Sequence, residues 1–293
     1  MKNIKINIPL ITPLDNKNNI DFFSLEKLIT YISNYKVDNL ILFDKFSENI
    51  TLSINEKIDI INCIFNNNIK NINIILKINN LYNYNDLIDI LNQKLYKNIY
   101  CFILDYPNLS YLYNNEIIKN YNKIFKNFKY LYFYLNFNKY NNFFFDENIF
   151  IELKKKNKNF LGIINKTKYI FNKYNLVNKL EIFINNDIYL FKNIYNINGI
   201  ISPLFLFFFD YINNNIILNI KNYKNIIYDL NYYNLVKFIN YLYNYKLNPL
   251  FCIKYLLEKL NICKKYIRKP CNNFEKFIKY YKKLKKIYNT III

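Results

Sequence analysis

Residues 4–43 read IKINIPLITPLDNKNNIDFFSLEKLITYISNYKVDNLILF, and this stretch contains one complete strand–helix–strand unit. The apolar run Ile4–Thr12 predicts a first strand, and Asn39–Phe43 predicts a second. Between them Leu25 and Leu28 stand at helical spacing behind Ser24, which we expect to cap the helix. A helix between two short strands predicts that these strands pair in parallel.

The same rhythm continues along the chain. Six more strands are predicted, at Ile72–Ile78, Cys101–Leu104, Tyr130–Tyr134, Leu161–Asn165, Leu180–Ile184 and Gly199–Ser202. Helices are expected between them, including Asp86–Gln93, Asn115–Phe125, Glu147–Lys155, Tyr169–Tyr174 and Ile188–Asn196. Eight strands that alternate with helices predict a closed (β/α)8 TIM barrel, with a doubly wound open sheet as the alternative.

The strand signals stop near residue 229. Three helical stretches follow, at Leu230–Tyr243, Leu250–Leu260 and Asn272–Ile287. We therefore predict a (β/α)8 barrel over residues 1–228 and a C-terminal three-helix region over 229–293.

Composition excludes several classes of function. The 293 residues are 52% hydrophobic, so the chain has enough apolar surface to fold. Histidine is absent, which excludes Ser-His and Cys-His nucleophile systems and histidine-bound metals. The five cysteines form no C-x-x-C pair, so neither a zinc site nor a disulfide framework is indicated. We expect no metal and no cofactor, and any catalysis has to use Lys, Tyr, Asp or Glu.

The net charge of +20 raises the question of nucleic acid. The lysines are spread along the whole chain and Arg268 is the single arginine, so no specific nucleic-acid partner is expected, only a weak, salt-sensitive affinity for polyanions. A basic binding module remains an alternative, which would need lysines clustered on one face.

No targeting segment is visible, and the longest apolar run, Leu204–Phe209, is too short to span a bilayer. These features favour a soluble, cytoplasmic protein without a membrane partner.

In a TIM barrel the active site lies at the C-terminal ends of the strands, so the residues there are the candidates. Lys45 and Phe46 follow the second strand, Tyr134 ends the predicted fifth, and Lys166 follows the sixth. The only two glycines, Gly162 and Gly199, both fall in strands, where they permit close approach of either packed backbone or a ligand.

Five short motifs occur in a fixed order from about residue 8 to residue 271. They are Ile11–Asp15, then Glu48 with Thr51, Leu52 and Glu56, then Leu161–Ile163, then Gly199–Ser202, and finally Asn248–Pro249 with Lys254 and Ile267–Pro270. In this order and spacing the chain resembles the dihydrodipicolinate synthase and N-acetylneuraminate lyase family. The resemblance implies a (β/α)8 barrel with C-terminal helices, assembled as a homotetramer or homodimer.

The resemblance also implies a chemistry. Members of this family are class I aldolases in which pyruvate forms a Schiff base with a barrel lysine and then attacks an aldehyde. Lys139, five residues after Tyr134, stands where members that use aspartate semialdehyde in lysine biosynthesis (the diaminopimelate pathway) carry an arginine for its carboxylate. By the same resemblance Tyr134 is the proton-relay tyrosine, and Ile201 is expected to border the substrate.

The chain departs from the family pattern at the nucleophile. The position of the Schiff-base lysine is occupied by Ile164, which cannot form an imine. Lys166 lies two residues on, on the same face of the strand, and is the predicted substitute, although another barrel lysine such as Lys77 is an open alternative. Lys45 and Phe46 replace the threonine pair that binds the pyruvate carboxylate. A second reading is therefore a barrel of the same descent that has lost catalysis and acts as a structural or regulatory subunit.

Overall fold

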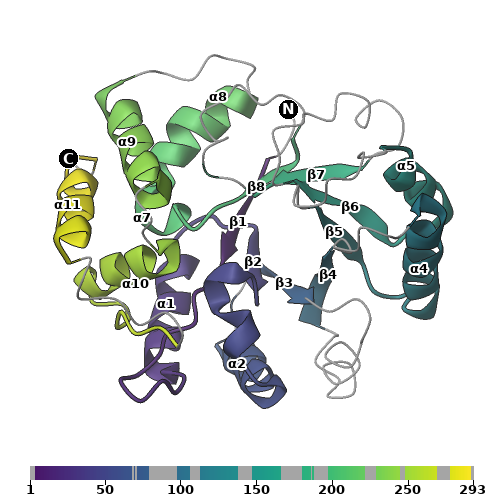
Figure 1. The fold of residues 1–293 in the computed structure, drawn as a ribbon, viewed down its shortest axis with the longest axis horizontal. Helices are drawn as coiled ribbons and strands as arrows, with labels where there is room; N and C mark the ends of the chain where they lie inside the picture. The colour runs from purple at the N-terminus through teal and green to yellow at the C-terminus, as the bar shows by residue number, and fades with distance from the viewer. Residues whose placement is uncertain are drawn as a thin grey trace.

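Eight parallel strands close into a barrel in the order in which they occur along the chain (Figure 1). The computed structural model describes residues 4–67, 69, 71–78, 98–105, 113–137, 147–165, 180–185, 187, 197–221, 229–244, 248–268 and 278–291. The strands are β1 (Lys5–Pro9), β2 (Asn39–Leu42), β3 (Asn73–Ile78), β4 (Ile99–Asp105), β5 (Phe133–Phe137), β6 (Phe160–Asn165), β7 (Glu181–Ile184) and β8 (Gly199–Ile201). The predicted TIM barrel is confirmed, and the open sheet is excluded because β1 pairs with both β2 and β8.

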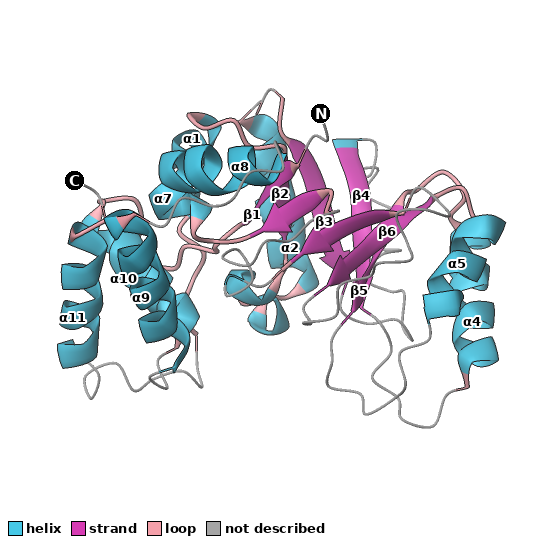
Figure 2. Cartoon of the chain, turned by 90° about the horizontal axis from the view of Figure 1, so that it is seen from above, coloured by secondary structure: helices cyan, strands magenta, loops and turns pink. Residues whose placement is uncertain are grey.

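Helices lie outside the barrel and beside it (Figure 2). They are α1 (Phe22–Ser33), α2 (Ile54–Asn66), α4 (Asn114–Asn127), α5 (Glu147–Lys156), α7 (Phe205–Tyr211), α8 (Leu218–Lys221), α9 (Leu230–Asn244), α10 (Pro249–Lys259) and α11 (Ile278–Asn289). A π-helical segment, Ile212–Ile217, connects α7 to α8. The helices expected at 86–93, 169–174 and 188–196 lie outside the described residues.

The start of α1 corrects one prediction. Asp21, not Ser24, is the N-cap, because its side chain accepts a hydrogen bond from the backbone N–H of Ser24. The carboxylate also accepts from the Ser24 hydroxyl at 2.6 Å. Either residue type satisfies a free N–H at a helix start, so the sequence alone did not separate them.

Alternate residues along each strand separate two apolar cores. Inside the barrel, a cluster of buried side chains fills the lumen: Ile41, Ile75, Cys101, Ile103, Tyr134, Ile164, Phe183 and Ile201. The intervening strand residues pack outward against the helices in a much larger cluster. This alternation fixes which strand residues point inward, and residues two positions further along each strand continue on the inner face.

The bounds of the fifth strand differ from the prediction by three residues. It covers Phe133–Phe137 and not Tyr130–Tyr134, because Phe128–Leu131 form the turn that follows α4. The side chains of Tyr130 and Tyr132 are 83% and 50% exposed. Tyr134 is consequently the second residue of the strand and does not stand at its C-terminal end.

The C-terminal helices α9, α10 and α11 pack together on one side of the barrel (Figure 1). The division into domains 1–228 and 229–293 stays a prediction. Within the described ranges, no helix combines the length and the low polarity that crossing a bilayer requires.

Both glycines are explained by close packing against the first residue of a neighbouring strand. A Cβ at Gly162 would lie 1.9 Å from the backbone oxygen of Glu181, the first residue of the neighbouring strand β7. A Cβ at Gly199 would lie 2.9 Å from the backbone oxygen of Lys5, the first residue of β1. Any larger side chain here would push the strands apart.

Candidate active site

Four polar residues meet at the C-terminal mouth of the barrel, and we call them the mouth cluster: Asp44, Lys77, Asp105 and Asn136. They come from four consecutive strands. Asp44 follows β2, Lys77 is next to last in β3, Asp105 ends β4 and Asn136 is next to last in β5. The last three lie two positions beyond lumen residues of their own strands, so they continue the inner face toward the mouth.

Lys77 lies at the centre of the mouth cluster. Its Nζ is 3.1 Å from Asp44 Oδ1 and 3.4 Å from Asp105 Oδ1. The lysine and Asp44 are buried, with 9% and 3% of the side chain exposed, whereas Asp105 is 26% exposed. A single ammonium therefore sits between one enclosed carboxylate and one that reaches solvent.

Asn136 holds Asp105 from the next strand. Its amide nitrogen donates a hydrogen bond to the same Oδ1 that faces Lys77. Its amide oxygen is buried and accepts no hydrogen bond from the described part of the chain. A buried acceptor of this kind is a place where a ligand hydroxyl or amide can bind.

Electrostatics keep Lys77 charged. Burial by itself would lower the pKa of the amine, but the charges of Asp44 and Asp105 outweigh it and raise the pKa above the ordinary value of 10.5. The resting amine is therefore an ammonium ion near neutral pH. It needs a proton acceptor before it can act as a nucleophile, and the two carboxylates are in contact with it.

The expected nucleophile position is apolar. Ile164 lies on β6 with 1% of its surface exposed, inside the lumen and in register with Asn136 on β5. The predicted substitute Lys166 and the predicted aldehyde-carboxylate lysine Lys139 lie outside the described residues. Of the lysines considered at the sequence level, Lys77 is therefore the one that the structure describes on an inward-facing strand position.

Tyr134 is directed to the opposite end of the barrel from the mouth cluster. Its hydroxyl donates to Glu181, which opens β7 and forms an ion pair at 3.1 Å with Lys5, which opens β1. We call Lys5, Tyr134 and Glu181 the basal cluster. Burial first, and then the neighbouring Cys101 and the charge of Glu181, raise the pKa of Tyr134 well above its ordinary value. The structure does not bring Tyr134 together with Lys77, and its role as a proton relay stays a prediction.

The other predicted substrate contacts lie around the lumen and its rim. Lys45 is exposed, with its Nζ 4.7 Å from the centre of the Phe46 ring, and Phe46 itself is buried. Ile201 is buried inside the lumen. Lys45 is thus exposed whereas Ile201 is enclosed, and their roles in binding pyruvate stay predictions.

A second polar group connects the barrel ends to the C-terminal helices. Asp187, after β7, accepts hydrogen bonds from Ser202, after β8, at 2.5 Å and from the Tyr243 hydroxyl of α9. Burial raises the pKa of the Asp187 carboxyl, although the two hydrogen bonds oppose this. This group positions α9 against the strand ends.

Several residues of the collinear motifs contact one another through hydrogen bonds and ion pairs. Lys254 of α10 is fully buried, and its Nζ donates to Glu48 and to the backbone oxygen of Tyr266. The backbone N–H of Arg268 donates to the other Glu48 oxygen at 2.8 Å, and its guanidinium pairs with Glu56 at the start of α2. These motif residues join the loop after β2 to the segment after α10, which explains their presence without assigning them to catalysis.

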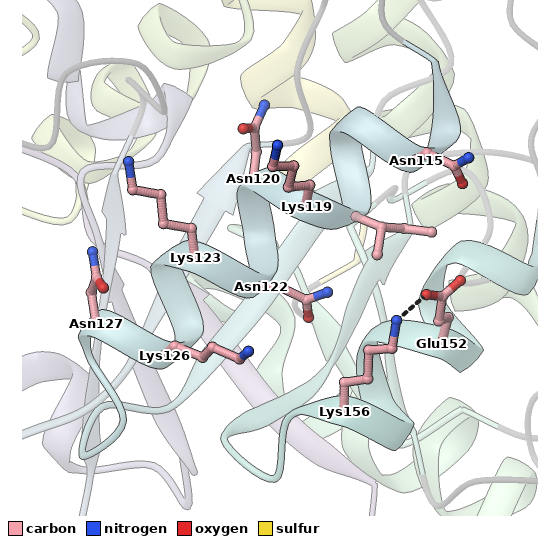
Figure 3. A pocket seen from close by; sticks show the side chains of 10 residues that line it. Asn115, Lys119, Asn120, Asn122, Lys123, Lys126, Asn127, Glu152 and Lys156 are labelled. Carbon is pink, nitrogen blue, oxygen red and sulfur yellow. Dashed lines mark hydrogen bonds and ion pairs between the residues drawn. The ribbon is translucent and has the colours of Figure 1, made fainter.

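A basic groove lies between α4 and α5 (Figure 3). It encloses about 720 Å³ and is lined by Lys119, Lys123 and Lys126 of α4 and by Lys156 of α5, together with several asparagines. Lys156 is paired with Glu152 at 2.5 Å. Lysines thus gather on one outer face at this point, which is the arrangement that the basic-module alternative requires.

Two residues of the mouth were not singled out from the sequence, Asp105 and Asn136. The signal was present, since each stands two positions beyond an apolar inward residue at the end of its strand. The misplaced fifth strand concealed Asn136. No trio of Cys, Asp or Glu side chains converges as a metal site in the described part of the chain.

Residues 3–81 match the model of the dihydrodipicolinate synthetase family. Over this stretch the chain is similar to that family. A 4-hydroxy-tetrahydrodipicolinate synthase from Karelsulcia muelleri (strain GWSS) is 51% identical to it over 67 residues, which span 22% of this chain and 23% of that protein. The family resemblance drawn from the motifs is confirmed.

Solved structures of the same fold cover nearly all of this chain. The 4-hydroxy-tetrahydrodipicolinate synthase of Methylacidiphilum fumariolicum SolV superposes with a TM-score of 0.80 at 16% identity, covering 99% of this chain and 97% of that one. N-acetylneuraminate lyase from Fusobacterium nucleatum superposes with a TM-score of 0.76 at 20% identity, covering 97% and 98%. At these identities the superpositions establish the fold, including the C-terminal helices.

Proposed function

We propose that this protein joins pyruvate to an aldehyde through a lysine Schiff base, as a 4-hydroxy-tetrahydrodipicolinate synthase that uses aspartate semialdehyde. The mouth cluster carries the proposal. It places a buried amine between two carboxylates at the end of a TIM barrel where catalytic residues of such barrels lie. Imine formation needs an amine and a group that moves protons beside it, and both are present there.

The name of the Karelsulcia muelleri relative supports this substrate pair, as does Lys139, a positive charge for the carboxylate of aspartate semialdehyde. Tyr134, Lys166, Lys45, Phe46 and Ile201 remain proposed site residues on the strength of the family resemblance. Assembly into a homotetramer or homodimer is part of the same proposal.

The test is borohydride trapping with the full-length protein. Incubation with pyruvate and sodium borohydride is expected to add one reduced pyruvyl group per chain, seen by intact mass. Protein treated with borohydride and acetate provides the control, because acetate has the carboxylate but no ketone. A folded protein that gains no pyruvyl mass contradicts a Schiff-base mechanism.

A second function is favoured by Ile164. A buried isoleucine at the position of the family lysine is what a barrel that has lost catalysis would carry. Such a chain would serve as a structural or regulatory subunit. Absence of a pyruvyl adduct, together with co-purification in a fixed ratio with an active aldolase subunit, would support this reading over the first.

A further inference from the structure

We propose that Lys77 on β3 is the amine that forms the Schiff base, and that Asp105 is the group that moves protons at it. This inference rests on the proposed function, and it moves the nucleophile from the β6 position held by Ile164 to a strand on another side of the lumen. Both side chains reach the space at the mouth of the barrel from the inner face of their strands.

Placement is the first argument. Lys77 follows the lumen residue Ile75 by two positions, as Asp105 follows Ile103, so both point into the barrel at its C-terminal end. A class I aldolase needs its amine at this end, where loops after the strands receive the substrates. Lys5, the matched basal lysine, opens its strand at the other end.

The two carboxylates are not equivalent, and this is the second argument. Asp44 is 3% exposed and remains an enclosed counter-charge, whereas Asp105 is 26% exposed and reaches the side from which a substrate enters. An iminium ion carries the same positive charge as the ammonium that it replaces. The covalent intermediate therefore keeps the ion pairs that stabilise the resting state.

Asp105 accepts and returns the protons that the reaction moves. Its carboxylate takes one proton from the Lys77 ammonium, and the free amine adds to the ketone carbon of pyruvate to form a carbinolamine. Asp105 returns that proton to the carbinolamine hydroxyl, which leaves as water, and an iminium remains. The carboxylate then removes a methyl proton to give the enamine.

The remaining steps reverse this sequence. The enamine carbon attacks the aldehyde, a carbon–carbon bond forms, and Asp105 protonates the new alkoxide. Water hydrolyses the restored iminium, which releases the product and returns Lys77 to the ammonium form. No oxidant, metal or cofactor enters the balance.

Asn136 acts as a positioning residue for this chemistry. Its amide nitrogen holds the Asp105 oxygen that faces Lys77, and its buried amide oxygen has no donor among the described residues. That oxygen is available to accept a hydrogen bond from the carbinolamine hydroxyl. An Asn136→Asp variant would lose the N–H donor that holds Asp105.

Peptide mapping of the borohydride adduct decides the assignment. In the wild-type chain the reduced pyruvyl group is expected on the peptide that contains Lys77. Lys77→Arg keeps the positive charge between the carboxylates but cannot form an imine, so trapping should fall to the level seen without pyruvate. Lys5→Arg, the matched basal control, should trap as the wild type does.

An Asp105→Asn variant tests whether Asp105 acts as a catalytic base or only as a structural partner of Lys77. It is expected to slow trapping by about 100-fold while the adduct, once formed, still maps to Lys77. An adduct on Lys166 or another lysine, with Lys77→Arg still active, would overturn this inference and leave the proposed function standing. No adduct in folded wild-type protein would remove both, and mapping of the wild-type chain gives this answer even if a variant fails to fold.

Discussion

The two ends of the barrel hold a lysine in similar ways but differ in what surrounds it. At the N-terminal end Lys5 pairs with Glu181 at 3.1 Å, and at the C-terminal end Lys77 pairs with Asp44 at the same distance and with Asp105 at 3.4 Å. At the base the strands are in close backbone contact through Gly162 and Gly199. At the mouth there are in addition a second carboxylate, Asp105, and the Asn136 amide oxygen, which accepts no hydrogen bond from the described residues. Similar ion pairs thus stabilise strand packing at the N-terminal end and, by our proposal, take part in catalysis at the C-terminal end.

The largest effect on stability is expected from a change at the N-terminal end of the barrel. Gly162→Ala would place a Cβ 1.9 Å from the backbone oxygen of Glu181, and no side-chain motion relieves a clash with backbone. We expect a loss of about 4 kcal/mol or more in the free energy of unfolding, or failure to fold, measured by circular dichroism and urea titration. Gly199→Ala, whose nearest backbone contact is 2.9 Å, is the milder comparison. A Gly162→Ala protein of wild-type stability would contradict the close contact between Gly162 and the Glu181 backbone.

The next effect compares the two lysines directly. Lys77→Met leaves Asp44 and Asp105 facing each other without a cation, and we expect a loss of about 3–5 kcal/mol in the free energy of unfolding. Lys5→Met removes a more exposed pair and should cost about 1 kcal/mol or less. Urea denaturation of both variants measures the difference. Equal losses would contradict the distinction between a buried and a partly exposed pair.

The pH dependence of stability sharpens the same comparison. The pKa of Lys77 is raised, so its pairing contributes fully below the ordinary value of 10.5 and is lost as pH rises through the higher pKa of the folded state. We therefore expect the wild-type protein to lose stability above about pH 10.5 more steeply than Lys77→Met does. Urea midpoints measured across this alkaline range give the two slopes, and parallel slopes would contradict the raised pKa.

The smallest effect concerns the outer surface, away from both barrel ends. Replacing Lys119, Lys123 and Lys126 with glutamine should lower the affinity of the α4–α5 groove for a polyanion such as heparin, seen as elution at lower salt. Trapping of pyruvate should not change, because the groove is separate from the mouth cluster.

A matched triple substitution on α11, at Lys282, Lys283 and Lys286, removes the same charge from another helix. Equal shifts in elution for the two triples would mean that net charge, and not the groove, determines polyanion binding. A larger shift for the α4 triple would favour a local site.

The fifth strand shows where the sequence pattern was insufficient. The run YLYFYLNF over residues 130–137 is apolar or aromatic at nearly every position, so it contains no alternation that would fix where the strand begins. Pairing of Tyr134 with Gly162 on β6 and of Asp105 with Asn136 set the register instead. A shift of three residues moved Asn136 from an unremarkable loop position to the mouth of the barrel.

The sequence by itself determined the barrel and the family resemblance. Period-2 and period-3.6 patterns depend on neighbouring residues, and the motif order is a property of the chain, so both were readable before folding. Only the tertiary structure decided which lysine meets which acid. Lys77 and Asp44 are 33 residues apart, and Asn136 and Asp105 are 31 apart. Their contact results from lateral strand pairing and barrel closure, and the energy of a buried ion pair depends on that enclosure, which no local pattern encodes.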